Sequence, residues 1–178
     1  MFNQLAAGRN KFSLRISAFA LAAGVLLLSS PGVSANPLCK KVKGHDQEHV
    51  ATENCTSPVG LCTAGEYSGD MRGNFFGTAT SLAPTADTPT TGVVLFTSDS
   101  TIHARIRGKN GDLKNGDLMI KNAGAFQTTG AGNIVDAQYI TGGTAELSGA
   151  TGILRASGTF SSATGMGESD YEGEICLP

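Results

Sequence analysis

Apolar and polar residues alternate along most of the chain beyond residue 35, and this alternation is typical of half-buried β-strands. Residues 100–107 are the clearest case, with three apolar side chains against three basic ones: Ile102, Ala104 and Ile106 against His103, Arg105 and Arg107. No window keeps apolar residues at helical spacing over three turns. Turn-forming residues separate the candidate strands 40–51, 65–81, 92–98, 100–107, 116–127, 135–141, 151–161 and 169–176. The pattern predicts an all-β domain.

Glycines within the strands indicate strong curvature. In the candidate strand 65–81, one face carries both large side chains and glycines: Tyr67, Gly69, Met71, Gly73, Phe75 and Gly77. Glycine inside a strand is typical of a sharp bend or of close approach by another backbone. We therefore expect a closed antiparallel barrel of about eight strands. The pattern does not decide which face of each strand lines the interior.

The first 35 residues have the features of a secretory signal peptide. Arg9, Lys11 and Arg15 form a basic start, an apolar stretch "SAFALAAGVLLL" follows, and "VSA" ends in Ala35, where we expect cleavage. A membrane anchor is the alternative, but the apolar stretch is shorter than the roughly 20 residues that a spanning helix needs. We expect a secreted or periplasmic protein without stable membrane insertion.

The expected mature chain, residues 36–178, is acidic and suits a single barrel domain. Without the three basic residues of the leader it has 10 Lys and Arg against 15 Asp and Glu, a formal net charge of −5. This excess argues against nucleic acid and anionic membrane as partners. It leaves small molecules and other proteins, including a homo-oligomer, as partner classes.

All four cysteines lie in this mature part: Cys39, Cys55, Cys62 and Cys176. Cysteines of exported proteins usually pair, so we expect two disulfides. A zinc site is the alternative, but no Cys-x-x-Cys or Cys-x-x-His spacing is present. The sequence indicates neither a metal nor another cofactor.

One stretch resembles a known family. The residues that carry the resemblance are Gly142, Gly143, Thr144, Leu147, Ala150 and Gly152 in "GGTAELSGATG". They are similar to the glycine turn Gly-Gly-Thr-Gly-x-Phe-x-x-Ala-x-Gly of dirigent proteins and to the corresponding turn of plant allene oxide cyclases. Ala145 stands where the pattern has glycine, and Leu147 replaces its aromatic residue. The chain thus resembles a bacterial, exported member of this calycin-type barrel group.

The resemblance implies a barrel with Leu147 as an apolar plug at one end, and Gly152 where the next strand begins. It also implies a small apolar ligand in the lumen and, in the cyclases, ring closure without a cofactor. Dirigent proteins instead guide the coupling of radicals that another enzyme generates. The acidic and asparagine motif of the cyclases' first strand has no counterpart here, so no catalytic residue is carried over. Whether the chain is a cofactor-independent cyclase or isomerase, or no enzyme, stays open.

The segment "KKVKGHDQEH" offers other chemistry. His45 and His49 lie four residues apart on a candidate strand, roughly 13 Å from each other, which is too far to share a metal ion. Asp46 and Glu48 on the other face would supply a general acid or base if they turned into a lumen. Exposed carboxylates are the commoner case, and we assign them no role.

Two function classes follow. In the first, the lumen binds a small apolar molecule, and the candidate lining residues are Tyr67, Met71, Phe75, Tyr139 and Phe160. In the second, side chains fill the lumen, and the outer surface of an envelope or extracellular barrel is the functional part. The volume of the lumen distinguishes the two classes.

A closed barrel with an even number of strands also predicts the disulfides. Its first and last strands are antiparallel neighbours, so Cys39 at the start of the first lies beside Cys176 at the end of the last. Cys55 and Cys62 then pair within the loop "CTSPVGLC".

Overall fold

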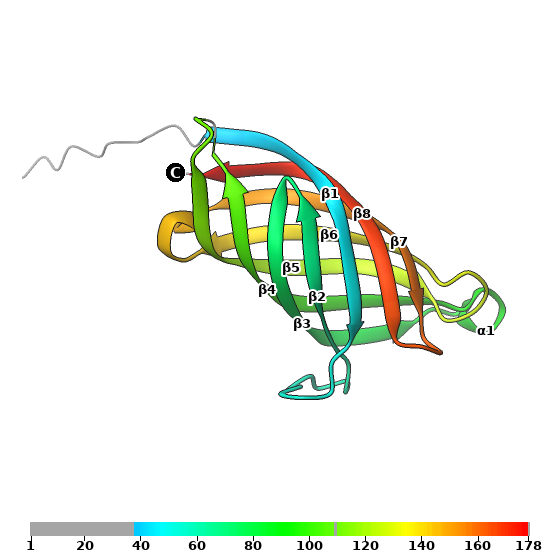
Figure 1. Ribbon diagram of the computed structural model, residues 1–178. Helices are drawn as coiled ribbons and strands as arrows, with labels where there is room; N and C mark the ends of the chain where they lie inside the picture. Colours follow the sequence, from blue (N-terminus) through cyan, green and yellow to red (C-terminus); the bar gives the residue numbers. More distant parts are fainter. Residues whose placement is uncertain (1–37, 109, 178) are drawn as a thin grey trace, which may run out of the picture. The chain divides into compact units, whose positions relative to one another are not determined.

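The chain folds into a closed antiparallel β-barrel (Figure 1). The computed structural model describes residues 38–108 and 110–177, so the expected signal peptide over residues 1–35 lies outside the described residues. The strands are β1 (Leu38–Val50), β2 (Cys62–Gly69), β3 (Met71–Pro84), β4 (Val93–Arg107), β5 (Leu113–Gln127), β6 (Asn133–Gly143), β7 (Thr151–Ser161) and β8 (Met166–Leu177). Each strand pairs with its neighbour in the chain, and β8 pairs with β1. The predicted all-β barrel of eight strands is confirmed.

Two predicted strand boundaries are wrong. The candidate strand 65–81 is a hairpin of β2 and β3, which turns at Gly69, a residue with a φ of 105°. The backbone N–H of Asp70 donates to the Lys43 carbonyl, and the Asp70 carboxylate accepts the Lys43 N–H, which holds the turn against β1. Conversely, the candidate strands 92–98 and 100–107 merge into one strand, β4, which begins at Val93, because Ser98, Asp99 and Ser100 pair in unbroken register with β5.

One half of the barrel interior is filled with apolar side chains. The core residues of that half are Val42, Met71, Ile102, Ile106, Leu118, Ile120, Ile140, Leu147, Leu154 and Ile175. They come from alternating positions, so in strand 100–107 the apolar set faces inward and the basic set faces solvent. This settles the orientation that the sequence pattern left open.

The short 3₁₀ helix η1 (Ala145–Leu147) lies between β6 and β7, next to the filled half of the barrel. Leu147 is fully buried there, as the plug interpretation predicted. The Thr144 N–H donates to the Asp117 carbonyl, and the Asp117 N–H donates to Thr144 Oγ1, which attaches η1 to β5. A side chain on Gly143 would clash with the Leu147 carbonyl oxygen, so only glycine allows this turn.

The remaining turn residues also lie as expected. Gly142 lies one residue before the end of β6, opposite Met119, and Gly152 is the second residue of β7, between Ile140 and Ile175. Gly152 has a φ of 153°, and a side chain on it would clash with the Glu174 carbonyl oxygen.

Both predicted disulfides are present. Cys39 pairs directly with Cys176 across the β1–β8 seam, and Cys55 pairs with Cys62 at the start of β2. The seam also carries opposite charges on its outer face, where Lys43 lies opposite Glu172, and His45 Nδ1 lies 3.2 Å from Asp170 Oδ1. The barrel is therefore closed by a covalent bond as well as by backbone hydrogen bonds.

Among the described residues, no helix has both the length and the apolar character needed to cross a membrane.

Candidate functional site

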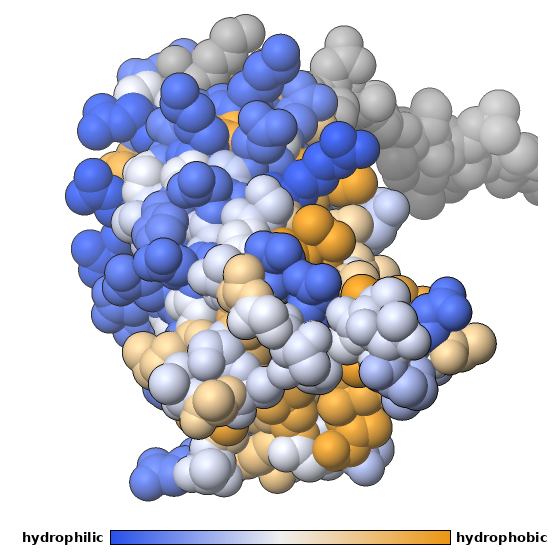
Figure 2. All heavy atoms as spheres, turned by 90° about the vertical axis from the view of Figure 1, so that its right-hand side faces the viewer, coloured by the Kyte–Doolittle hydropathy of each residue, from blue (hydrophilic) through white to orange (hydrophobic). Residues whose placement is uncertain are grey.

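The half of the barrel away from η1 contains a cavity of about 100 Å³. All eight strands contribute to its walls. The lining residues include Asp46, Glu48, Thr63, Tyr67, Phe75, Leu82, Phe96, Ser98, Ser100, Asn122, Phe126, Ile134, Asp136, Gln138, Ala156, Phe160 and Ser169. Figure 2 shows the face of the molecule on the side of α1 (Thr88–Thr91), where apolar side chains gather over one part and hydrophilic ones cover the other. The interior of the barrel is therefore filled with apolar side chains in the half near η1, whereas the other half contains this cavity.

Aromatic rings form the apolar part of the cavity wall. Phe126 contacts Phe96 and Phe160 edge-to-face, with both ring centroids 6.1 Å away. Tyr67 contacts Phe75 in the same way at 5.3 Å. Edge-to-face packing directs ring edges at ring faces and stabilises a fixed wall rather than a loose cluster.

Inward glycines make room for the large side chains of this wall. Gly167 of β8 lies between Glu48 of β1 and Phe160 of β7. A Cβ atom on Gly167 would lie 2.9 Å from both Glu48 Cγ and Phe160 Cδ2. The absent side chain therefore allows a carboxylate and a ring to share one level of the lumen.

Three carboxyl groups line the cavity. Asp46 and Glu48 occupy alternate positions of β1, and Asp136 comes from β6. Asp46 is only 6% exposed. Burial, followed by the nearby charges of Glu48, Asp136 and Asp170, raises the pKa of Asp46 to about 7. Burial likewise raises the pKa of Asp136 to about 6 and raises that of Glu48. Asp46 and Asp136 therefore exchange protons near neutral pH.

A hydrogen-bonded chain runs from Tyr67 to Asp136. The Tyr67 hydroxyl donates to Gln138 Oε1 over 3.1 Å, and Gln138 Nε2 donates to Asp136 Oδ2 over 3.2 Å. Burial raises the pKa of Tyr67 well above its usual value, so Tyr67 stays a donor. By contrast, Oδ1 of Asp46 and Oδ1 of Asp136 are buried and have no hydrogen-bond partner among the described residues. Such oxygens are costly unless a further group satisfies them.

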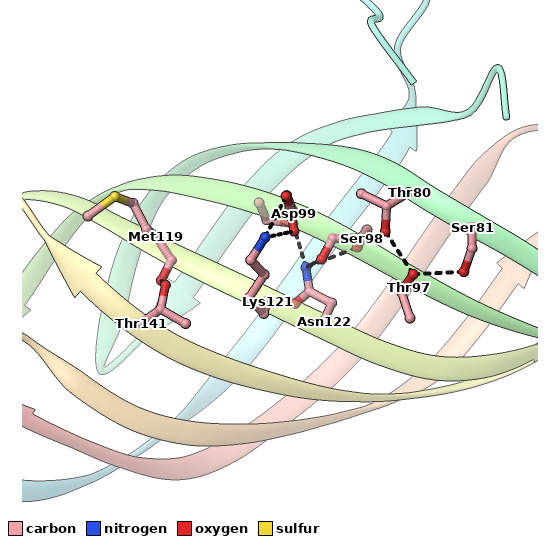
Figure 3. A network of polar contacts seen from close by, with 10 residues as sticks. Thr80, Ser81, Thr97, Ser98, Asp99, Met119, Lys121, Asn122 and Thr141 are labelled. Atoms are coloured by element: carbon pink, nitrogen blue, oxygen red, sulfur yellow. Dashed lines mark hydrogen bonds and ion pairs between the residues drawn. The ribbon is translucent and has the colours of Figure 1, made fainter. Parts of the chain in front are cut away.

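A neutral polar cluster lies on the opposite part of the wall. Asn122 Nδ2 donates to Ser98 Oγ over 3.0 Å and to Ser100 Oγ over 2.7 Å. Figure 3 shows Asn122 reaching Ser98 while Asp99 and Lys121, one position along, form an ion pair on the outer face. The alternation of β4 and β5 therefore keeps this ion pair out of the lumen.

The five predicted lining residues divide into three groups. Tyr67, Phe75 and Phe160 line the cavity. Met71 faces inward but is fully buried in the filled half, where its N–H donates to the Tyr171 hydroxyl. The prediction is wrong for Tyr139, which is 50% exposed on the outer face. β6 directs Asp136, Gln138 and Ile140 inward. Because this face mixes polar and apolar residues, the sequence did not show which face of β6 points into the barrel.

The sequence interpretation missed most of the polar lining. Asp46 and Glu48 were expected to be exposed, but both turn into the lumen, and Asp136, Gln138 and Asn122 were not singled out. Val42 lies on the same face of β1 as Asp46 and Glu48, and its apolar side chain was the signal that this face points inward.

The histidines behave as expected for a solvated face of β1. His49 is exposed, and His45 contacts Asp170 across the seam. In the described part of the chain, the cluster of potential metal ligands consists of Cys39, Glu174 and Cys176, and both of its sulfur atoms form a disulfide.

Fold and site together define a closed antiparallel barrel with one plugged half and one hollow, acid-lined half. No protein-family model matches the chain, and the search of curated proteins finds no significant match. The resemblance to the allene oxide cyclase and dirigent group therefore stays a prediction.

Proposed function

We propose that this protein binds a small molecule with an apolar body and one polar group in the hollow half of its barrel. The observation that carries the proposal is Asp46, a carboxyl group that lines a cavity, is 6% exposed and has an oxygen without a partner. A bound polar group would satisfy this oxygen, while the ring wall would bury the apolar body.

The cavity volume limits the size of the ligand. A volume of about 100 Å³ is below the roughly 300–1,000 Å³ of pockets for drug-sized ligands. A dry cavity of about 150 Å³ is sufficient for benzene. The proposed ligand is therefore no larger than a single-ring molecule, and affinity in the micromolar range or weaker is expected because little apolar surface is buried.

We also propose that the protein is exported and belongs to the allene oxide cyclase and dirigent-like barrels. Two disulfides support an oxidising compartment. The closed eight-stranded barrel and the buried Leu147 support the family. A cofactor-independent cyclase or isomerase would need proton donors and acceptors in a water-poor site, and carboxyl groups that titrate near neutrality suit that chemistry.

The second candidate is a barrel whose outer surface is the functional part, as in a structural or interaction protein or a homo-oligomer. Exposed apolar residues favour it: Tyr139 and Ile153 pair across β6 and β7, and both are about half exposed. The half-hollow lumen favours ligand binding over this alternative, because a barrel without a ligand gains stability from a completely filled core.

The test is a ligand screen on the mature protein with no metal or nucleotide added. Saturable binding of small phenols, terpenoids or other single-ring compounds is expected in calorimetry, with little binding of long fatty acids. Phe75→Ala and Phe160→Ala should weaken that binding, whereas Tyr139→Ala on the outer face should not. An absence of saturable binding across the screen would favour the outer-surface function.

A further inference from the structure

The charges that line the cavity are all of one sign. Asp46, Glu48 and Asp136 are acidic, and the lining set contains no Lys, Arg or His. Lys41 and Lys43 of β1 alternate to the outer face, and Lys40 donates to the Arg107 carbonyl outside the cavity lining. A buried carboxylate is normally paired with a cation, so this lumen lacks the counter-charge that its own side chains would be expected to supply.

The geometry of the three carboxyl groups does not suit a metal ion. Metal ligation needs at least three donor atoms close to one another, and the described residues form such a group at Cys39, Glu174 and Cys176 but not in the cavity. Asp46 and Glu48 lie on β1, whereas Asp136 lies on β6, which pairs with neither β1 nor β2. Carboxylates spread over two walls suit a cation larger than a metal ion.

The aromatic wall suits an organic cation. Phe75, Phe96, Phe126 and Phe160 line the same cavity as the carboxyl groups. The faces of aromatic rings attract ammonium groups, and the attraction increases when water is excluded. Phenylalanine rings and carboxylates in one small cavity thus complement a molecule that is apolar and positively charged.

Building on the function proposed above, we propose that the ligand is a small organic ammonium ion, with its nitrogen hydrogen-bonded to Asp46, with Glu48 and Asp136 adding negative charge nearby, and with its apolar body against the phenylalanine wall. Asp46 supports this choice most directly, because it is more than nine-tenths buried with Oδ1 unsatisfied, and an ammonium N–H would donate to that oxygen.

The alternative is a neutral ligand that accepts a hydrogen bond from a protonated carboxyl group. The two differ in pH dependence, which is set by the groups around Asp46. These are Glu48 on β1, Tyr67 on β2, Asp136 on β6 and Asp170 on β8; β3, β4, β5 and β7 contribute apolar or neutral polar side chains to the lining. Because Asp46 and Asp136 lose protons near neutral pH, a cation binds more tightly as pH rises, whereas a neutral acceptor binds less tightly.

The experiment compares benzylamine with benzyl alcohol, which have the same shape and differ in charge. Binding is measured by calorimetry on the mature protein at pH 5.5 and pH 8.0. Benzylamine should bind at least tenfold more tightly at pH 8.0 than at pH 5.5. At pH 8.0 it should also bind at least tenfold more tightly than benzyl alcohol. Asp46→Asn should remove most of this preference and leave the alcohol bound. Glu172→Gln, on the exposed face of β8, is the matched control and should change neither Kd.

The possible results separate the two proposals. If benzyl alcohol binds as tightly as benzylamine, or if amine binding weakens as pH rises, the cation proposal is overturned and lumen binding stands. If neither probe nor any compound of the wider screen binds, both proposals fail. A thermal melt of Asp46→Asn shows that the variant is folded, and Asp136→Asn provides a second, independent loss of charge in the same cavity.

Discussion

Asp46 is the residue that determines most of the expected pH dependence of folding. Its pKa is about 7 in the folded protein against 3.8 for the ordinary group. Between these two values the folded state holds a proton that the unfolded state has released. The contribution of Asp46 to stability is therefore highest below about pH 4 and is lost as pH rises to 7. Asp136 and Glu48, whose pKa values are also raised, act in the same direction.

We predict that the ligand-free protein melts at a lower temperature at pH 8 than at pH 5. Asp46→Asn should stabilise the protein at pH 8 by about 1–3 kcal/mol, because each pKa unit corresponds to about 1.4 kcal/mol and the neighbouring carboxylates share the effect. At pH 5 the folded Asp46 is neutral but the unfolded one is already ionised, so the advantage of the variant should be smaller than at pH 8 and should disappear only below about pH 4. Calorimetric melting curves at both pH values test this, and a wild-type melting temperature that rises with pH would contradict it.

Ala145 occupies a position that favours glycine. Its φ is 50°, in the left-handed region, and it stands where the dirigent and cyclase turn has glycine. A left-handed alanine costs about 1–2 kcal/mol, part of which glycine loses again through its flexible unfolded state. We predict that Ala145→Gly stabilises the protein by about 0.5–1 kcal/mol in urea denaturation.

Ala137→Gly is the control for this substitution. Ala137 lies in β6 and is not among the residues with positive φ, so glycine there should destabilise by about 0.5–1 kcal/mol. Equal effects of the two substitutions would show that the left-handed conformation at Ala145 is not the cause.

At the scale of elements, η1 packs against the filled half of the barrel and contributes a side chain to its core. Leu147 is the buried residue of η1, and it packs into a core with Leu118 and Ile106. Thr144 exchanges two hydrogen bonds with Asp117 of β5, and the Glu146 carboxylate accepts the Asn115 N–H of β5, which holds η1 in place. The cavity lies in the other half, and its lining does not include Leu147.

We predict that Leu147→Ala destabilises the protein by about 2–5 kcal/mol, because it leaves a cavity in a packed core. Ligand binding by the molecules that remain folded should change little. Urea denaturation measures the loss of stability, and calorimetry below the transition measures binding. The control is Val135→Ala at an exposed position, whose free energy of unfolding should stay within about 0.5 kcal/mol of the wild type. A large effect of Leu147→Ala on ligand binding would contradict the prediction and would mean that the two halves of the lumen are coupled.

At the scale of the whole molecule, the Cys39–Cys176 bond joins the two ends of the folded chain. It closes a sequence separation of 137 residues, whereas Cys55–Cys62 closes one of 7. In the chain-entropy account, a cross-link over a longer loop removes more freedom from the unfolded state. The two bonds therefore differ in their expected contribution even though both lie at strand ends.

We predict that replacing Cys39 and Cys176 together by serine lowers stability by up to about 5 kcal/mol, against up to about 2.5 kcal/mol for Cys55 and Cys62. Urea denaturation of the two double variants, without reducing agent, gives the comparison. Peptide mapping of the wild type under non-reducing conditions is the control for the pairing. A larger loss from the short loop than from the long one would contradict the entropic account.

The fold was predictable because alternation, turn residues and cysteine positions are local or nearly local signals. The Asn, Gly and Pro breaks separated most strands, and barrel closure correctly paired Cys39 with Cys176. The boundary errors were local too. The turn at Gly69 kept Tyr67 and Met71 on one face, so the alternation ran through it unbroken, whereas the polar residues Ser98 to Ser100 imitated a turn inside β4.

The candidate site was only partly predictable. Tyr67, Phe75 and Phe160 could be placed in the lumen because large apolar side chains avoid water. Tyr139 was misplaced because the inward face of β6 mixes Asp136 and Gln138 with Ile140. A single strand does not show which of two mixed faces points inward, and this depends on the strands beside it.

The sequence by itself thus determined the all-β barrel, most of the strands, the two faces of most strands and the disulfides, because each depends on neighbours in the chain or on closure alone. Only the tertiary structure decided that one half of the lumen is hollow and that Asp46, Glu48 and Asp136 line it. Asp136 on β6 lies far in sequence from Asp46 and Glu48 on β1. A carboxyl group becomes buried, unpaired and able to titrate near neutral pH only when strands from the whole barrel exclude water around it.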